Sequence, residues 1–391
     1  MLSYKYLIIG GAMTSSAAID GIRSIDEDGS IGIISEEEYK PYERPPLTKG
    51  LWHETKLDSI FLEFNNTNIE FYLNTKATKI DAKKKNVTDN KGQQYKYTKL
   101  LLATGASPKI ISKESDRVIY YRYLRDYKKL RKLTEKYSTF GIIGGGFIGS
   151  EIAAALASLG KKVTMIFPEE GIGGLRFPEE LAIYLNRYYE DNGVVVHPRT
   201  KVETVGEKNN RVIIKTDKGE FSYDAVIVGI GVSPNTDLAQ SIGVKIDDGI
   251  KVDEYLRTSE ADIYAAGDVT SFYSPDLDRS IRVEHEDNAY EQGKLAGKNM
   301  AGALKKYDHL PFFYSDLFDY GYEAVGILNP KLEVIEDWRD EYEEGIIYYL
   351  QNGIVVGVLL WNVWDQLDNA RELIAGKKKL QKEELLGYLP K

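Results

Sequence analysis

The sequence contains no cysteine among its 391 residues. A thiol pair that carries electrons as a disulfide therefore has no residues from which to form. Zinc and iron–sulfur sites held by thiolates are excluded for the same reason, and we expect no metal site. This absence rules out disulfide, thiol-peroxide and sulfide chemistry by the chain's own thiols.

The chain also lacks an excess of positive charge, since 51 Lys and Arg residues stand against 60 Asp and Glu residues and the formal net charge is -9. Nucleic-acid binding needs a basic face that neutralises phosphates, so we expect no nucleic-acid partner. We expect no leader peptide, because an apolar strand begins within a few residues of Met1. The apolar stretch at 345–364 is interrupted by Asn352 and Gly353, which predict a β-hairpin instead of a transmembrane segment. We therefore expect a cytoplasmic protein that is a monomer or weak homodimer.

The central motif of the chain is IIGGGFIGSE at residues 142–151, where an apolar strand leads through glycines into a helical pattern. In such a turn the first glycine makes the bend, and the second lets backbone N–H groups approach a pyrophosphate. The third lets helix and strand pack closely. The predicted binding residues of this turn are Gly144, Gly146, Phe147, Ile148 and Gly149.

A second copy of the pattern lies at residues 7–15, LIIGGAMTS, with a helix predicted over 13–25. In each copy an acidic residue follows the next apolar strand, Glu36 in one and Glu169 in the other. This is the offset expected of a carboxylate that holds a ribose hydroxyl. Two dinucleotide folds in one chain predict two nucleotides, a flavin and a nicotinamide cofactor.

A proline-rich loop, PYERPPLTKGLW, follows at residues 41–52. Pro45 and Pro46 fix φ and exclude helix, which predicts a stiff loop holding Arg44 and Lys49 in defined places near the first cofactor. The alternative is a surface loop with two solvated cations.

Each dinucleotide unit ends in a similar apolar strand and glycine turn, LLLATGASP at 100–108 and AVIVGIGVSPN at 225–235. Asp268 follows Gly267 at the end of an apolar run, where its carboxylate is expected to meet a helix N-terminus or a polyol. The alternative is that Asp268 is only the N-cap of the following segment. Binding residues predicted in these turns are Ala103, Thr104, Gly105, Gly231, Gly267 and Asp268.

The rest of the chain is predicted from periodicity. Residues 282–302 should form a helix with a small-residue face, with Glu284 and His285 at its start. The acidic segment 337–344 is expected to be a solvated loop. Single strands are predicted at 4–9 and 31–35, and several short strands at 59–98, at 243–266 and within 307–391. Further helices are predicted at 120–137, 179–192 and 365–375.

Seven of these motifs in order resemble one branch of the FAD-dependent pyridine-nucleotide reductase superfamily, the branch of apoptosis-inducing factor and the ferredoxin and rubredoxin reductases. They are PYERPPLTKGLW, IIGGGFIGSEIA, FPEEG, AAGD, RVEHEDNA, YEAVGI and IIYYLQNGIVVGVLLWN. The resemblance implies an α/β fold with two Rossmann-like dinucleotide-binding domains and a C-terminal α+β cap domain. It assigns FAD to 1–112 and 238–306, NADH to 113–237 and the cap to 307–391.

The resemblance also implies roles for single residues. Lys49 and Glu151 match an ion pair beside the reactive flavin edge, and Phe147 an aromatic over the flavin, with a core phenylalanine as the alternative. The implied catalytic residues are Lys49, Glu151, Phe147 and His285. The other implied FAD contacts are Gly10, Gly11, Ala12, Ser15, Glu36, Arg44, Asp268, Glu284 and Tyr314; of these, Ala12 and Ser15 replace glycines of the first turn, and Tyr314 replaces a Trp.

The expected function is FAD-dependent transfer of hydride from NADH and of electrons to an external acceptor. That acceptor is left open among a ferredoxin- or rubredoxin-type carrier, quinone and oxygen. Glu169 favours NADH over NADPH, although Arg176 nearby would offset this. The alternative is a redox-sensing interaction protein that holds a stable reduced FAD–NAD charge-transfer complex.

Overall fold

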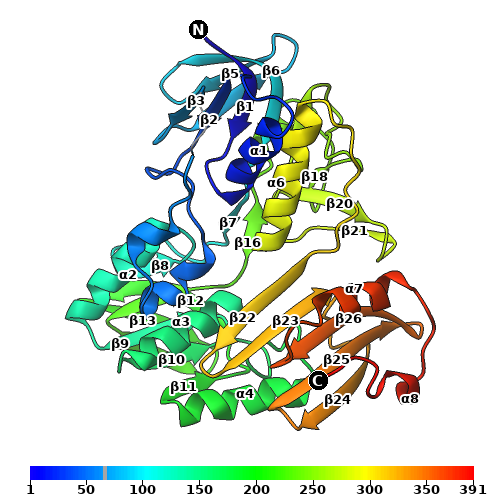
Figure 1. Cartoon of the computed structure of the whole chain (residues 1–391). Coiled ribbons are helices and arrows are strands. Elements are labelled where there is room, and N and C mark those ends of the chain that lie inside the picture. The colour runs from blue at the N-terminus through cyan, green and yellow to red at the C-terminus, as the bar shows by residue number, and fades with distance from the viewer. Residues whose placement is uncertain (65–67) are drawn as a thin grey trace. The chain divides into compact units, whose positions relative to one another are not determined.

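The computed structural model describes residues 1–64 and 68–391, which divide into two compact units (Figure 1). Unit 1 comprises Met1–Arg44, Lys56–Ser107 and Ser233–Pro311. Unit 2 comprises Pro45–Thr55, Pro108–Val232 and Phe312–Lys391. Unit 2 therefore contains most of the segment expected to bind NADH, most of the C-terminal segment, and residues 45–52 of the proline-rich loop, which include Lys49.

Unit 1 is built on a seven-stranded sheet in the order β3-β2-β1-β6-β5-β4, with β19 paired to β6. Strands β3, β2, β1, β6 and β19 run parallel, whereas β5 and β4 are antiparallel additions. Buried β-branched and leucine residues on both faces produce the parallel core. The strands are β1 Leu2–Ile9, β2 Ile31–Ile34, β3 Ile69–Tyr72, β4 Ala77–Asp81, β5 Asn86–Asp89, β6 Gln94–Leu102 and β19 Ile263–Ala265.

Two helices of unit 1, α1 (Met13–Arg23) and α6 (Glu286–Met300), pack closely through glycines. A Cβ on Gly293 would lie 2.3 Å from the Thr14 carbonyl oxygen, and one on Gly297 would lie 2.1 Å from that of Ala18. The predicted small-residue face is confirmed. Unit 1 also contains the smaller elements α5 Asp237–Gln240, β17 Ile246–Asp247, β18 Gly249–Lys251, β20 Thr270–Ser274, β21 Arg279–Ile281 and the 3-10 helix Leu57–Ile60. The short strands β7 Ala106–Pro108 and β16 Val232–Pro234 span the points in the sequence where one unit ends and the other begins.

Unit 2 contains a parallel sheet in the order β11-β10-β9-β15-β8. A three-stranded antiparallel meander, β12-β13-β14, belongs to the same part. The strands are β8 Val118–Tyr120, β9 Thr139–Ile143, β10 Lys162–Ile166, β11 Val194–His197, β12 Val202–Lys208, β13 Arg211–Thr216, β14 Gly219–Tyr223 and β15 Ala225–Val228. The helices are α2 Leu124–Lys136, α3 Phe147–Ser158 and α4 Glu179–Asp191.

The C-terminal part of unit 2 is an antiparallel sheet in the order β22-β23-β26-β25-β24 (orange to red in Figure 1). The predicted hairpin at Asn352 and Gly353 is confirmed, with φ values of 56° and 77° that suit a tight turn. The elements are β22 Phe312–Leu317, β23 Tyr320–Gly326, β24 Glu333–Asp340, β25 Glu344–Gln351, β26 Ile354–Trp361, α7 Leu367–Ala375 and α8 Lys382–Leu385.

The expected solvated loop at 337–344 is right only for residues 341–343, which form a turn; residues 337–340 belong to β24, and Glu344 begins β25. Asp337 lies in β24 and is only 6% exposed. Its carboxylate accepts hydrogen bonds from the backbone N–H of Gly387 at 2.8 Å and the ammonium of Lys391 at 2.5 Å. Because these donors come from the distant C-terminal segment, the local acidic composition gave no sign of them.

The expectation that Pro45 and Pro46 exclude helix is also wrong. Pro45–Leu47 and Gly50–Trp52 are short 3-10 helices. Proline is tolerated in a first helical turn, where its missing N–H has no intrahelical partner to lose.

Several predicted helices are shorter in the structure. The helix expected over 120–137 begins at Leu124, because residues 118–120 are drawn into the parallel sheet as β8. The helix expected over 282–302 begins at Glu286, and the one expected over 13–25 ends at Arg23. Within the described residues, no helix combines the length and apolarity that a membrane crossing requires.

Candidate functional site

The glycine turn of unit 2 gives each of its three glycines a separate task. Gly144 has φ +112°, and a Cβ there would lie 2.3 Å from the Gly229 carbonyl oxygen. A Cβ on Gly149 would lie 2.1 Å from the carbonyl oxygen of Gly144, so helix α3 and the turn pack closely. Gly146, in contrast, faces open space within 4 Å. It is also the N-cap of α3, so a pyrophosphate fits against the helix N-terminus there.

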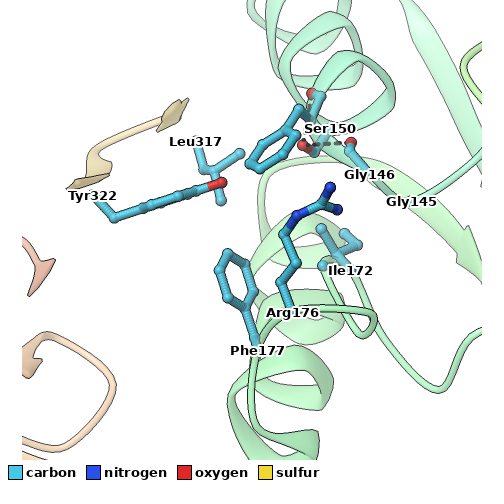
Figure 2. A pocket seen from close by; sticks show the side chains of 10 residues that line it. Gly145, Gly146, Ser150, Ile172, Arg176, Phe177, Leu317 and Tyr322 are labelled. Atoms are coloured by element: carbon cyan, nitrogen blue, oxygen red, sulfur yellow. Dashed lines mark hydrogen bonds between the residues drawn. The ribbon is translucent and has the colours of Figure 1, made fainter. Parts of the chain in front are cut away.

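A pocket opens beside this turn (Figure 2). Figure 2 shows the Arg176 guanidinium pointing toward Gly146 and the Tyr322 hydroxyl pointing toward the pocket. The Arg176 Cζ atom lies 4.4 Å from the ring centre of Phe147, a cation–π contact. Phe147 is half-buried and lines the pocket, which argues against the alternative of a core phenylalanine. The lining residues are Gly145, Gly146, Phe147, Ser150, Ile172, Gly173, Arg176, Phe177, Leu317 and Tyr322.

The Lys49–Glu151 ion pair is formed, with 2.6 Å between Nζ and Oε1. Glu151 is 6% exposed, and two hydroxyl groups complete its hydrogen bonding. Oε1 accepts from Ser315 at 2.5 Å, and Oε2 accepts from Thr48 at 2.5 Å. Three donors thus replace the water that burial takes from the carboxylate. Sequence reasoning missed Thr48 and Ser315, and no pattern in the sequence marks them.

Two further groups of unit 2 surround the ammonium of Lys49. It lies 5.2 Å from the ring centre of Tyr314, the residue that replaces a tryptophan in the resemblance. Burial raises the pKa of Asp316, an effect that Lys49 opposes and Glu151 reinforces. The surroundings of the ammonium therefore include an aromatic ring and two acidic side chains.

The proline-rich loop is fixed to unit 2 at several points around Lys49. The Leu47 carbonyl accepts hydrogen bonds from the Tyr121 hydroxyl at 2.5 Å and the Trp52 indole N–H at 2.7 Å. The Tyr127 hydroxyl donates to the Leu51 carbonyl at 2.9 Å. Tertiary hydrogen bonds therefore hold the loop in place around Lys49, in addition to the two prolines.

The glycine turn of unit 1 repeats part of this geometry. Gly10 has φ +119°, and a Cβ there would lie 2.0 Å from the Ala103 carbonyl oxygen. A Cβ on Gly11 would lie 2.4 Å from Oγ of Ser35. Ser15, which replaces the third glycine, is buried and donates to the Ala12 carbonyl at 2.6 Å. The Ser15 hydroxyl is thus satisfied within the first turn of α1, of which Ala12 is the N-cap.

Gly267 and Asp268 lie beside this turn. A Cβ on Gly267 would lie 2.4 Å from Oγ1 of Thr14 in α1. The buried Gln292 accepts from the Gly267 N–H at 2.8 Å, while its Nε2 donor has no partner among the described residues. A spare buried donor and a glycine cradle fit a dinucleotide. Asp268 precedes strand β20, so capping of a following helix is not its role.

Other predicted site residues lie as follows. Glu36 is exposed and pairs with Lys76 at 3.1 Å, whereas Arg44 pairs with Glu37 at 2.9 Å. Thr104 and Asn235 exchange two hydrogen bonds between a side chain and a carbonyl, which join the two similar turns. The Gly105 carbonyl accepts a hydrogen bond from the backbone N–H of Asn235, and Gly231 has φ +90°. Ile148 lies in α3, and Glu169 is half-buried after β10. Glu284 forms an ion pair with Arg282, and His285 is the N-cap of α6.

Comparisons with known proteins cover nearly the whole chain. Residues 4–293 match the family described as pyridine nucleotide-disulphide oxidoreductase. Residues 296–339 and 334–376 match the family described as apoptosis-inducing factor, mitochondrion-associated, C-term.

Individual relatives agree with these matches. Apoptosis-inducing factor 1 of Dictyostelium discoideum is 34% identical over 97% of this chain and 79% of the relative. The anthranilate 1,2-dioxygenase system ferredoxin–NAD(+) reductase component of Burkholderia cepacia is 32% identical over 96% of this chain and 95% of the relative. A crystal structure of a ferredoxin reductase from Rhodopseudomonas palustris superposes with a TM-score of 0.89 at 25% identity, covering 97% of this chain and 96% of that one. The predicted fold class, with Rossmann-like parts and a C-terminal sheet, is confirmed.

Proposed function

The chain belongs to the pyridine nucleotide-disulphide oxidoreductase family, and we propose that it moves hydride from NADH to FAD and electrons onward to a small carrier protein, without a redox disulfide. It is an oxidoreductase that uses FAD and NAD(H). The chain has no cysteine, so the onward electrons have no thiol pair through which to pass. We further propose a cytoplasmic protein, monomeric or weakly dimeric.

The observation that carries this proposal is the clustering of Lys49, Glu151 and the Phe147 pocket within unit 2. FAD supplies the ring that accepts hydride and releases electrons singly or in pairs. The Lys49 ammonium stabilises the negative charge that develops when that ring is reduced, and Glu151 orients the ammonium. The Gly146 turn binds the pyrophosphate of the nicotinamide nucleotide, and Phe147 bounds its nicotinamide end.

The three-domain division remains part of the proposal. FAD would occupy residues 1–112 and 238–306, where Gly10, Gly267 and the spare Gln292 donor lie. NADH would occupy residues 113–237. Residues 307–391 would form the cap, which supplies Ser315 to the Glu151 carboxylate and Tyr314 to the Lys49 ammonium. Arg44, Asp268, Glu284 and His285 are proposed FAD contacts.

The carrier is proposed to be a ferredoxin- or rubredoxin-type protein. Support comes from the Burkholderia cepacia relative, whose name states that it is a ferredoxin reductase. Quinone and oxygen are the competing acceptors.

The test is anaerobic mixing of the yellow holoprotein with NADH while the visible flavin band is followed, and then addition of each acceptor in turn. We expect fast bleaching by NADH and fast recovery with ferredoxin or rubredoxin. Recovery with only quinone or oxygen would contradict the carrier, and failure to bleach would contradict the hydride transfer.

A second candidate is favoured by the match of residues 296–376 to the C-terminal part of apoptosis-inducing factor. In this alternative the protein senses redox state by holding reduced FAD and NAD together. The same experiment then gives slow bleaching to a long-wavelength charge-transfer band that no acceptor discharges.

A further inference from the structure

One charged side chain lines the pocket beside the glycine turn of unit 2. Among the described residues that form this lining, only Arg176 carries a charge, and its guanidinium points toward Gly146 (Figure 2). The other lining groups are glycines, apolar or aromatic side chains and the hydroxyls of Ser150 and Tyr322. All of them belong to unit 2, either to the segment proposed to bind NADH or to the proposed cap. The charge of the pocket lining is therefore set by Arg176.

The backbone of Arg176 is held on both sides. Its N–H donates to the Gly173 carbonyl at 2.8 Å, and its carbonyl accepts from the Tyr349 hydroxyl of β25 at 2.7 Å. The N–H of Gly173 in turn donates to the Gly145 carbonyl of the glycine turn at 2.8 Å. The loop that carries Arg176 is thereby joined to the turn proposed to bind the nucleotide. Because these bonds use backbone groups of Arg176, a change of its side chain leaves them in place.

The guanidinium is half-buried and lies against an aromatic ring, with its Cζ atom 4.4 Å from the ring centre of Phe147. Ile172, Phe177 and Leu317 are apolar parts of the same pocket lining. Partial burial of a charge among such groups costs free energy, and a cation–π contact returns only part of it. An arginine also keeps its proton in proteins, so this positive charge is permanent. A permanent charge kept at a cost beside a binding turn indicates a role in binding.

Glu151 and Tyr322 could bring negative charge to the pocket, but neither adds a net negative charge. The Glu151 carboxylate is paired with the Lys49 ammonium at 2.6 Å. The Tyr322 hydroxyl stays neutral, because burial raises its pKa. Glu151 reinforces this rise and Arg176 opposes it, so the field of the guanidinium reaches a hydroxyl that points toward the pocket (Figure 2). The pocket lining of unit 2 therefore presents positive charge.

We propose that Arg176 makes this pocket select the reduced nicotinamide ring over the oxidised one. The inference rests on the proposed function, which puts the nucleotide pyrophosphate at the Gly146 turn and the nicotinamide beside Phe147. When NADH gives a hydride, two electrons and one proton, to FAD, its neutral dihydropyridine ring becomes a pyridinium with one positive charge. A permanent cation in the pocket lining repels the pyridinium but not the neutral ring. Arg176 thus weakens the binding of NAD+ and favours its release.

The two forms of the nucleotide make it possible to separate this role from simple attraction to phosphate. NADH and NAD+ share the same adenosine and pyrophosphate groups and differ in charge only at the nicotinamide ring. A guanidinium that bound the pyrophosphate alone would strengthen the binding of both forms equally. The ratio of the two affinities therefore isolates the effect on the ring. Repulsion between two unit charges, screened by protein and solvent, should change that ratio about tenfold.

The test uses oxidised holoprotein and two nucleotides that leave the flavin oxidised. NAD+ carries the pyridinium, and tetrahydro-NAD carries a neutral ring that gives no hydride. Titration calorimetry measures both dissociation constants. We expect the wild type to bind tetrahydro-NAD about tenfold more tightly than NAD+, Arg176→Gln to bind the two about equally, and Arg176→Lys to keep most of the preference. The matched control is Arg187→Gln, because Arg187 is an exposed arginine of α4 outside the pocket lining and its loss should keep the ratio.

A wild type that binds both nucleotides with equal affinity would overturn the selection. So would an Arg176→Gln variant in which both affinities fall together and their ratio is kept, because the guanidinium would then bind only the pyrophosphate. Urea midpoints and FAD content show whether each variant is folded. Reduction of the flavin by NADH is measured on the same preparations. Normal reduction in the wild type without the selection rejects only this inference, whereas failed reduction rejects the proposed function.

Discussion

The ammonium of Lys49 and the carboxylate of Glu151 lie 2.6 Å apart, although 102 positions separate them in the sequence. The two residues reach each other by different routes. Lys49 is held by a loop whose carbonyls are bound by tyrosine and tryptophan side chains, and Glu151 projects from the second turn of α3. The pair joins the nucleotide turn to the proline-rich loop inside a single unit.

Replacement of Lys49 by alanine should slow anaerobic flavin reduction by NADH about 100-fold while FAD stays bound, because a preorganised donor to developing charge is lost. Stopped-flow bleaching of the flavin band measures the rate. The control is Lys162→Ala, an exposed lysine of the same unit. Wild-type rates in Lys49→Ala would remove this residue from the mechanism.

Ser315→Ala should destabilise the protein by about 2 kcal/mol, because the buried carboxylate of Glu151 loses a charge-assisted hydrogen bond. Urea unfolding followed by circular dichroism gives this difference. Ser274→Ala is the comparison, since the buried Ser274 hydroxyl has no partner among the described residues and its removal should be close to neutral. Equal effects of the two substitutions would count against the hydrogen bond.

Alanine substitutions in the glycine turn should separate binding from folding. Gly146→Ala adds a methyl group to open space, so the urea midpoint should hold while NADH binding weakens about tenfold, or about 1.4 kcal/mol. Gly149→Ala meets the Gly144 carbonyl at 2.1 Å and should cost about 1–3 kcal/mol of stability. Titration calorimetry and unfolding curves test both. Unchanged NADH affinity in Gly146→Ala would show that the pyrophosphate lies elsewhere.

NADH should saturate flavin reduction at lower concentration than NADPH. Glu169 is expected to repel a 2′-phosphate, and the Arg176 guanidinium is engaged with the Phe147 ring. Glu169→Gln should lower the NADPH concentration that saturates flavin reduction, and so reduce the difference between the two nucleotides. Comparable saturation by the two nucleotides in the wild type would refute the preference.

Acid should weaken unit 1 partly through Asp262. Hydrogen bonds from the ammonium groups of Lys85 and Lys99, each 2.5 Å away, lower the pKa of Asp262 below its unfolded value. The interaction therefore stabilises the fold above about pH 4 and is lost as pH falls further. Asp262→Asn should lower the melting temperature at pH 7 and flatten its decline below about pH 4. Asp308→Asn, at an exposed site, should leave the acid profile unchanged.

Much of the fold could be predicted because its signals are local. The two glycine turns follow from steric rules that apply at Gly10 and Gly144 whatever surrounds them, and both adopt positive φ. The hairpin at Asn352 and Gly353 is local in the same sense. Helix ends were less predictable, since pairing of β8 with its sheet decided where α2 begins.

The absence of thiol chemistry, the two nucleotide turns and the alternating strands follow from the sequence alone, because each depends on residue type or short-range geometry. Tertiary contacts instead decide which donors meet Glu151 and why Asp337 is buried. These contacts join segments that are distant in the chain, such as Thr48 and Ser315, and no local pattern encodes them. Burial makes these contacts necessary, because a carboxylate removed from water must find its hydrogen-bond donors inside the protein.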